Sequence, residues 1–172
     1  MKTKLILALA IPLFIAGCDL IKDATTVEID TTLKANIPVV VVQPQKGLAA
    51  ISFTKTQDLT LASNTDLEPY LSKIEEISLN GVTITVTGLQ AGQTINSVAL
   101  DVTGVGNIFT QTNITSTNNS FSPVIDSGKL SQVATKLTND LKITLTVSGS
   151  ASGPMTFTVG VNFDATVVAA AL

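Results

Sequence analysis

Carboxylates form the one cluster of side chains in this sequence whose spacing could support chemistry. The chain of 172 residues has 13 Asp and Glu and 10 Lys, with no His and no Arg. Two close carboxylates could act as acid and base on a glycoside, or they could bind calcium, although no Asp-x-Asp-x-Asp-Gly spacing is present. Capping and solvation of a short helix explain the cluster more simply. We therefore expect no catalytic residues, no metal site and no cofactor; the clustered residues are Asp58, Asp66, Glu68, Glu75 and Glu76.

The residue types that are missing exclude several other kinds of site. Without His there is no Ser-His-Asp triad and no imidazole metal ligand. Without Arg, and with a net charge of −3, the chain is a poor partner for nucleic acid. Ser127-Gly128-Lys129 lacks the order of a Ser-x-x-Lys pair, and an exposed Lys stays protonated. Gly104 and Gly106 lack the third glycine and the helix of a phosphate loop, so they predict a strand break. We expect that the protein is not an enzyme.

The single cysteine ends a short apolar segment at the N-terminus. Lys2 and Lys4 precede an apolar run from Leu5 to Ile15, which is shorter than the roughly 20 residues of a membrane-spanning helix. This pattern is typical of a secretory signal peptide. The residues Ile15-Ala16-Gly17-Cys18 resemble the lipobox of bacterial lipoproteins, in which an aliphatic residue and two small ones precede a cysteine. The resemblance covers the first 18 residues and says nothing of the rest of the chain.

The resemblance implies a lipid anchor and a division of the chain. In bacterial lipoproteins the cysteine sulfur receives a diacylglycerol, the peptide is cut just before the cysteine, and the new amine is usually acylated. Residues 1–17 would be the signal peptide, 18–25 the lipidated Cys18 with its tether, and 26–172 a single domain. Cleavage leaves eight Lys against the 13 acidic residues, a side-chain charge of −5. Acyl chains rather than charge must then hold the protein to an anionic membrane. The implied location is the bacterial cell envelope, with the membrane and the leaflet left open.

Alternating apolar and polar residues predict about eight β-strands in the body. From Val27 to Ile37 every second residue is apolar or Thr, whereas the run Val39–Val42 is entirely apolar and is expected to be covered on both sides. Pro38 cannot donate to a ladder and marks an edge, a bulge or a break. A change of parity at Asn80-Gly81 predicts a bulge. Further strands are predicted over residues 48–61, 77–87, 95–103 and 107–114, and residues 141–148 and 155–167 predict a hairpin.

Two short helices are predicted between the strands. Thr65 and Glu68 have the spacing of a capping box, and Leu67, Leu71 and Ile74 would share a face of that helix. The second helix runs from about Ser127 to Leu137, and Asp126 or Ser127 can cap it. Its buried stripe consists of Leu130, Val133, Ala134 and Leu137.

These elements predict a mainly β fold. Two helices of this length cannot cover a sheet, and each strand has one polar face, so two antiparallel sheets should pack against each other as a β-sandwich. A β-barrel is the alternative.

Three surface features could carry a function. Thr-x-Thr pairs resemble ice-binding arrays, but they have no constant period, and β-propensity explains them better. The polar loop 113–123 contains Phe121, which is the candidate contact for a partner unless it tucks under its own loop. The apolar residues Val167–Leu172 either complete an internal strand or offer an edge to a partner.

The sequence thus predicts a non-catalytic lipoprotein of the bacterial cell envelope that acts as a structural or protein-interaction module. Its expected partners are a membrane, through the covalent lipid, and a protein of the envelope. A β-sandwich that binds a glycan or an apolar small molecule is the alternative, and it requires a concave pocket with an exposed Phe or Tyr. A carboxylate-only enzyme would require two close carboxylates in a cleft, one with a raised pKa.

Overall fold

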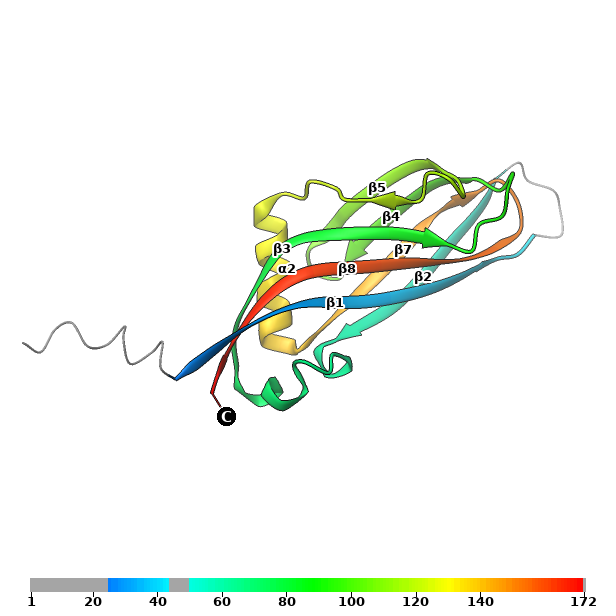
Figure 1. The fold of residues 1–172 in the computed structure, drawn as a ribbon. Helices are drawn as coiled ribbons and strands as arrows, with labels where there is room; N and C mark the ends of the chain where they lie inside the picture. The colour runs from blue at the N-terminus through cyan, green and yellow to red at the C-terminus, as the bar shows by residue number, and fades with distance from the viewer. Residues whose placement is uncertain (1–24, 44–49, 172) are drawn as a thin grey trace, which may run out of the picture.

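The computed structural model describes residues 25–43 and 50–171. Cys18, the signal peptide 1–17 and most of the tether lie outside this range. The described residues form eight strands, one α-helix and two 3-10 segments, drawn in Figure 1. The strands are β1 (Thr26–Val41), β2 (Ile51–Thr60), β3 (Ile74–Thr87), β4 (Ile95–Val102), β5 (Gly106–Ile114), β6 (Ser120–Phe121), β7 (Lys142–Ala151) and β8 (Met155–Ala170). The helical segments are η1 (Leu61–Ser63), η2 (Glu68–Lys73) and α2 (Ser127–Asp140).

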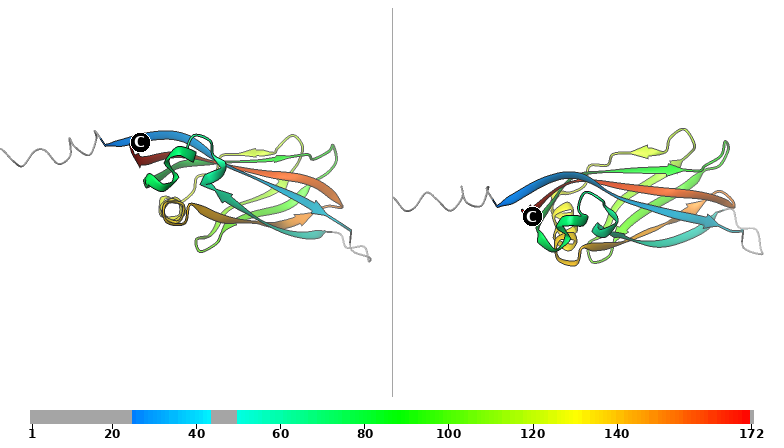
Figure 2. Two further views of the ribbon diagram at one scale, coloured as in Figure 1. Left: turned by 90° about the horizontal axis from the view of Figure 1, so that it is seen from below. Right: turned by 60° about the horizontal axis from the view of Figure 1, so that its bottom comes forward.

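The strands form two antiparallel four-stranded sheets, which confirms the predicted β-sandwich. One sheet has the order β1-β8-β3-β6 and the other the order β2-β7-β4-β5, and neither closes on itself. The two sheets face each other as layers in Figure 2. Their inner faces meet in one apolar core in which Phe53 and Phe157 pack edge to face, with ring centroids 5.3 Å apart.

Strand β1 follows its alternating sequence pattern along almost its whole length. It pairs with all of β8, and its odd-numbered residues from Leu33 to Val41 are buried. Pro38 sits in this edge strand, as its missing N–H requires. The expectation that Val39–Val42 is covered on both sides is wrong, because the alternation continues and leaves Val40 65% exposed and Val42 70% exposed.

The predicted hairpin of residues 141–148 with 155–167 is also wrong. Strand β7 lies between β2 and β4, whereas β8 lies between β1 and β3 in the opposite sheet. Residues 152–154 therefore cross from one sheet to the other. Alternation shows which face of a strand is buried, but it does not show which sheet supplies the neighbours. The C-terminal apolar run up to Ala170 completes an internal strand, one of the two roles predicted for it.

The bulge predicted at Asn80-Gly81 is confirmed. The pairing of β3 with β8 shifts register between Leu79 and Gly81. The extra residue moves Val82, Ile84 and Val86 onto the buried face.

The first helix does not have the predicted capping box. Leu67 is the residue that precedes η2, and it makes no side-chain cap. Asn64 organises this segment instead, because its side-chain oxygen accepts from Asp66 N at 2.9 Å and its backbone oxygen accepts from Glu68 N at 3.1 Å. Leu67 itself is fully buried.

The second helix, α2, begins as predicted and crosses one end of the sandwich (Figures 1 and 2). The Asp126 carboxylate accepts from Lys129 N at 3.2 Å, so Asp126 is the N-cap. The helix ends at Asp140, and the next residue, Leu141, has a left-handed φ of 54°. Val133, Ala134 and Leu137 are buried as predicted, whereas Leu130 is only half-buried.

Candidate functional site

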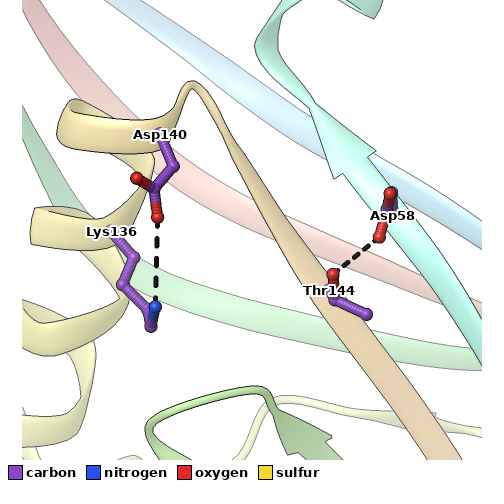
Figure 3. Close-up of polar contacts among 4 residues, drawn as sticks. All are labelled: Asp58, Lys136, Asp140 and Thr144. Carbon is purple, nitrogen blue, oxygen red and sulfur yellow. Dashed lines mark hydrogen bonds and ion pairs between the residues drawn. The ribbon is translucent and has the colours of Figure 1, made fainter.

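The clustered carboxylates are spread over several elements, and two of them, Asp58 and Asp66, link neighbouring segments. Asp58 on β2 accepts a hydrogen bond from Thr144 Oγ1 on β7 at 2.7 Å (Figure 3). Asp66 accepts from Thr31 Oγ1 at 3.2 Å and so ties the η1–η2 segment to β1. Glu75 and Glu76 lie exposed at the start of β3. Within residues 25–43 and 50–171, no three His, Cys, Asp or Glu come together as a possible metal site.

The lysines near α2 also make structural contacts. Lys129 Nζ donates to the backbone oxygen of Asn107 at 2.6 Å. Lys136 Nζ lies 4.0 Å from Asp140 on the same helix (Figure 3), and a surface pair of this kind contributes about 0–1 kcal/mol. Gly104 and Gly106 have φ values of 81° and 92° at the turn between β4 and β5. The strand break predicted at these glycines is therefore confirmed.

Phe121 lies on the short strand β6, which pairs with β3. Its ring is half-buried and its centroid lies 5.8 Å from that of Phe109. Phe121 therefore packs partly onto the core and leaves part of its ring accessible. Its role as a contact for a partner stays a prediction.

Threonine hydroxyls link neighbouring strands on the outer faces of both sheets. Thr166 Oγ1 donates to Asp30 at 2.8 Å and accepts from Asn80 Nδ2 at 3.2 Å. On the other sheet the hydroxyls of Thr56 and Thr146 lie 3.3 Å apart. Such cross-strand pairs stabilise a solvated sheet face.

Two grooves lie near the end that α2 closes. One, of about 380 Å³, runs between α2 and β3 and has Leu79, Leu130 and Ala134 among its lining residues. The other, of about 490 Å³, lies between β1 and the η1–η2 segment, beside Asp30 and Asp66. Neither of these two grooves has an aromatic side chain in its lining, which the ligand-binding alternative requires. Phe53 and Phe109 each line another groove, but both side chains are buried.

The sandwich has two distinct ends. Thr26 pairs with Ala170, so the entry to the domain and its C-terminal strand lie together, next to α2 and η2 (Figure 1). The connections 88–94, 115–119 and 152–154 lie at the opposite end (Figures 1 and 2). We call these the entry end and the loop end.

Among the residues that the structure describes, every Asp, Glu and Lys lies toward the entry end, a feature that the sequence reasoning missed. A boundary separates the part of the sandwich that carries charged residues from the part that does not. In one sheet it follows the paired residues Lys34, Asn162 and Thr83, and in the other it follows the row of paired residues that contains Lys55. Beyond these rows the described segments contain no Asp, Glu or Lys. We call them together the uncharged half, and they are residues 35–43, 50–54, 84–99, 110–121 and 148–161. The signal in the sequence is a set of long runs without charge, such as 82–100 and 143–163.

No helix in the part of the chain that the structure describes is long and apolar enough to cross a membrane. No model of a known protein family matches the sequence, and no curated protein matches it. Among solved structures, a chain of desmodium yellow mottle tymovirus is similar over 100% of this chain and 97% of its own length, with 13% sequence identity and a TM-score of 0.38. At that level the similarity identifies neither a family nor a function.

Proposed function

We propose that this chain is a lipid-anchored, non-catalytic protein of the bacterial cell envelope whose β-sandwich serves as a structural or protein-interaction module. The observation that carries the proposal is the sequence Ile15-Ala16-Gly17-Cys18 at the end of a short apolar segment with a basic start. The tether would join the sandwich at its entry end, where Thr26 begins β1.

Under this proposal, the position of the anchor and the elongated strands would determine which end of the domain faces the membrane. The seven residues 19–25 span at most about 25 Å when fully extended, so the entry end would stay close to the lipid surface. Strand β1 has 16 residues, which corresponds to a length of about 50 Å. The uncharged half would therefore be the part of the domain held farthest from the membrane.

The placement of the carboxylates favours a module over an enzyme. Asp58 and Asp66 each accept a hydrogen bond from a Thr of a neighbouring strand. Glu68 and Glu75 stand at the starts of different elements. These contacts give Asp58 and Asp66 a structural role. The membrane attachment would come from the acyl chains, since two chains provide stable anchoring where one gives only marginal binding.

Replacing the proposed lipid acceptor tests the anchor. Full-length protein with Cys18→Ser should accumulate in its uncleaved form or lose its membrane association, whereas unchanged protein should sediment with the membrane and require detergent for release. Val124→Cys is a control, because it adds a thiol at a fully exposed position and leaves Cys18 in place. Membrane association and N-terminal processing that are both unaffected by Cys18→Ser would contradict the proposal.

Cross-linking on native membranes, followed by purification of this chain, tests the module role. A reproducible protein partner, or a second copy of the chain, is the expected product. Recovery of neither under several cross-linking conditions would count against an interaction role.

A further inference from the structure

We propose that the free edge of strand β1 is a surface through which two copies of this chain pair, and that Asn64 keeps this edge closed. Among the described residues, β1 pairs with β8 along one edge and has no strand along the other. Such an edge presents backbone N–H and C=O groups to which another strand can be added. The charges along β1 favour a second copy of the chain as the source of that strand.

The even-numbered residues of β1 direct their backbone groups toward the free edge. The backbone oxygen of Thr25 accepts from Ala171 N at 2.7 Å, and these two residues lie opposite each other in the register of β1 with β8. Hydrogen-bonded pairs alternate along an antiparallel ladder, so odd positions bond to β8 and even positions face outward. Thr32 agrees with this assignment, because its backbone oxygen accepts from Asn64 Nδ2, on a segment outside the sheet, at 3.3 Å.

The charged residues of β1 are complementary when Thr32 of one copy lies opposite Thr32 of the other. In that antiparallel register, Asp30 of each copy faces Lys34 of the other copy. Glu28 is a diagonal neighbour of the same Lys34, and no two carboxylates of β1 are direct or diagonal neighbours. All three charged side chains are exposed, and none forms an ion pair with another described residue. A register with Asp30 opposite Asp30 would instead bring like charges together.

The paired edge would have a limited length. Pro38 has no N–H to give to a shared ladder, so the pairing would end before it and extend over residues 28–36. Stable interfaces bury about 800 Å² on each partner, and one short strand edge supplies only part of that area. The pairing should therefore be weak, and a covalent trap is the suitable way to detect it.

The segment of residues 61–73, which we call the cover, closes the middle of this edge. Asn64 Nδ2 donates to Thr31 Oγ1 at 2.9 Å as well as to the backbone oxygen of Thr32. Thr31 Oγ1 in turn donates to Asp66 at 3.2 Å. The oxygen of Thr32 is the acceptor that both copies need at the centre of the pair. Asn64 and a second copy therefore compete for the same backbone group.

Hydrogen bonds, more than close packing, hold the cover against β1. A groove of about 490 Å³ lies between residues 30–34 of β1 and residues 63–66 of the cover. Leu61 and Leu67 are fully buried and fix the two ends of this stretch in the core. A shift of residues 62–66 would therefore open the edge without unfolding the domain. The inference goes beyond the proposed function and does not depend on the lipid anchor.

Disulfide trapping in the full chain tests the register and the cover together. Directly opposite residues in a hydrogen-bonded pair have Cα atoms about 5.5 Å apart, which suits a disulfide. With the cover in place, Thr32→Cys should give little disulfide-linked dimer under mild oxidation. Adding Asn64→Asp should raise the dimer yield several-fold. A carboxylate still accepts from Asp66 N, but it has no donor for the oxygen of Thr32.

Matched controls separate the register from the cover. Asn36→Cys combined with Asn64→Asp should give no dimer, because the two thiols would lie about 13 Å apart along the strands. Asn118→Asp combined with Thr32→Cys should not raise the yield, because it makes the same chemical change at the loop end. The chain without an added cysteine reports any linkage through Cys18.

Charge reversal tests whether the partner is a second copy in this register. Adding Lys34→Glu to Thr32→Cys and Asn64→Asp should lower the dimer yield several-fold, because carboxylates would then face each other. Adding Asp30→Lys as well should restore much of the yield, because opposite charges again lie across the pair.

Three results would overturn the proposal. They are a dimer yield that Asn64→Asp does not raise, equal yields from Thr32→Cys and Asn36→Cys, and a yield that Lys34→Glu does not lower. An unchanged thermal unfolding midpoint would verify that each variant folds. If Asn64→Asp lowers the midpoint, Asn64→Ser takes its place, because its hydroxyl is too short to reach Thr32. Membrane sedimentation of the same samples reports on the anchor separately, so failure of the pairing and failure of the proposed function can be distinguished.

Discussion

Asn113 occupies a backbone conformation that most residues avoid. Its φ is 54°, and its side chain is exposed near the end of β5. Asn tolerates the left-handed region, whereas other residues with a Cβ are strained there by roughly 1–2 kcal/mol. We expect Asn113→Ala to lower the free energy of unfolding by about 1 kcal/mol and Asn113→Gly to leave it nearly unchanged. Urea denaturation measures both values, and the neighbouring exposed Thr112→Ala controls for loss of a side chain. Equal stability of Asn113→Ala and Asn113→Gly would refute this expectation.

Gly149 is required by close packing between strands. A Cβ at this position would collide with the backbone oxygen of Ser97 and lie 2.9 Å from Phe53 Cζ. We expect Gly149→Ala to destabilise the protein by about 1–3 kcal/mol, because the central strand β7 must shift to make room. Gly153→Ala is the matched control, since a Cβ there meets nothing within 4 Å. Thermal unfolding of the two variants checks this expectation. A midpoint for Gly149→Ala equal to that of Gly153→Ala would contradict it and would show that the strands move apart at no cost in stability.

At this scale some features can be predicted from the sequence and others cannot. Asp126 was recognisable as a helix cap because the interaction spans only three residues. The resemblance of Ile15-Ala16-Gly17-Cys18 to a lipobox is equally local. The crowding at Gly149 depends on Ser97 and Phe53, which are distant in the chain, so no local pattern contains it.

Helix α2 depends on its first turn, where Asp126 satisfies an otherwise free backbone donor. We expect Asp126→Ala to lower the free energy of unfolding by about 1 kcal/mol, and Asp126→Asn to lower it by only a few tenths. The carboxylate of Asp140 at the other end of the helix makes no cap and has only a weak surface pair with Lys136, so Asp140→Ala is the control for loss of a carboxylate. Chemical denaturation followed by circular dichroism measures the three variants. A loss in Asp140→Ala as large as that in Asp126→Ala would mean that charge, and not capping, is responsible.

Local periodicity identified the strands, but it did not identify their neighbours. The alternation in β1 and the parity change at Asn80-Gly81 were sufficient to predict a strand and a bulge. The partners of β7 and β8 were not predictable in this way, because a three-residue connection can either turn within a sheet or cross to the opposite one. The capping box at Thr65 was wrong because Asn64 offers the backbone a competing turn.

On the scale of the whole molecule, the proposed anchor lies at one end and the uncharged half, defined on the described residues, lies at the other. Each uncharged run was visible in the sequence, but only the fold brings the five segments to the same end. The charge separation is therefore a tertiary property. The far tip of this half would lie about 50 Å from the entry end, as judged from the length of β1.

Fluorescence energy transfer tests this orientation. We expect a dye at Ala62→Cys, an exposed position in η1 near the entry end, to transfer energy efficiently to acceptor lipids. A dye at Gly153→Cys at the loop end should transfer less, because the ten-residue strands β2 and β7 place it about 34 Å farther from the membrane. Equal transfer from both positions would mean that the domain lies flat on the membrane.

The intact mass of the mature protein tests the central claim most directly. Protein purified from its native membrane should begin at Cys18 and exceed the polypeptide mass of residues 18–172 by a diacylglycerol, with a further acyl group when the new amine is modified. Fragmentation should assign the added mass to Cys18. A mature chain with an unmodified Cys18, or one cut at a position other than the bond before Cys18, would contradict the lipid anchor.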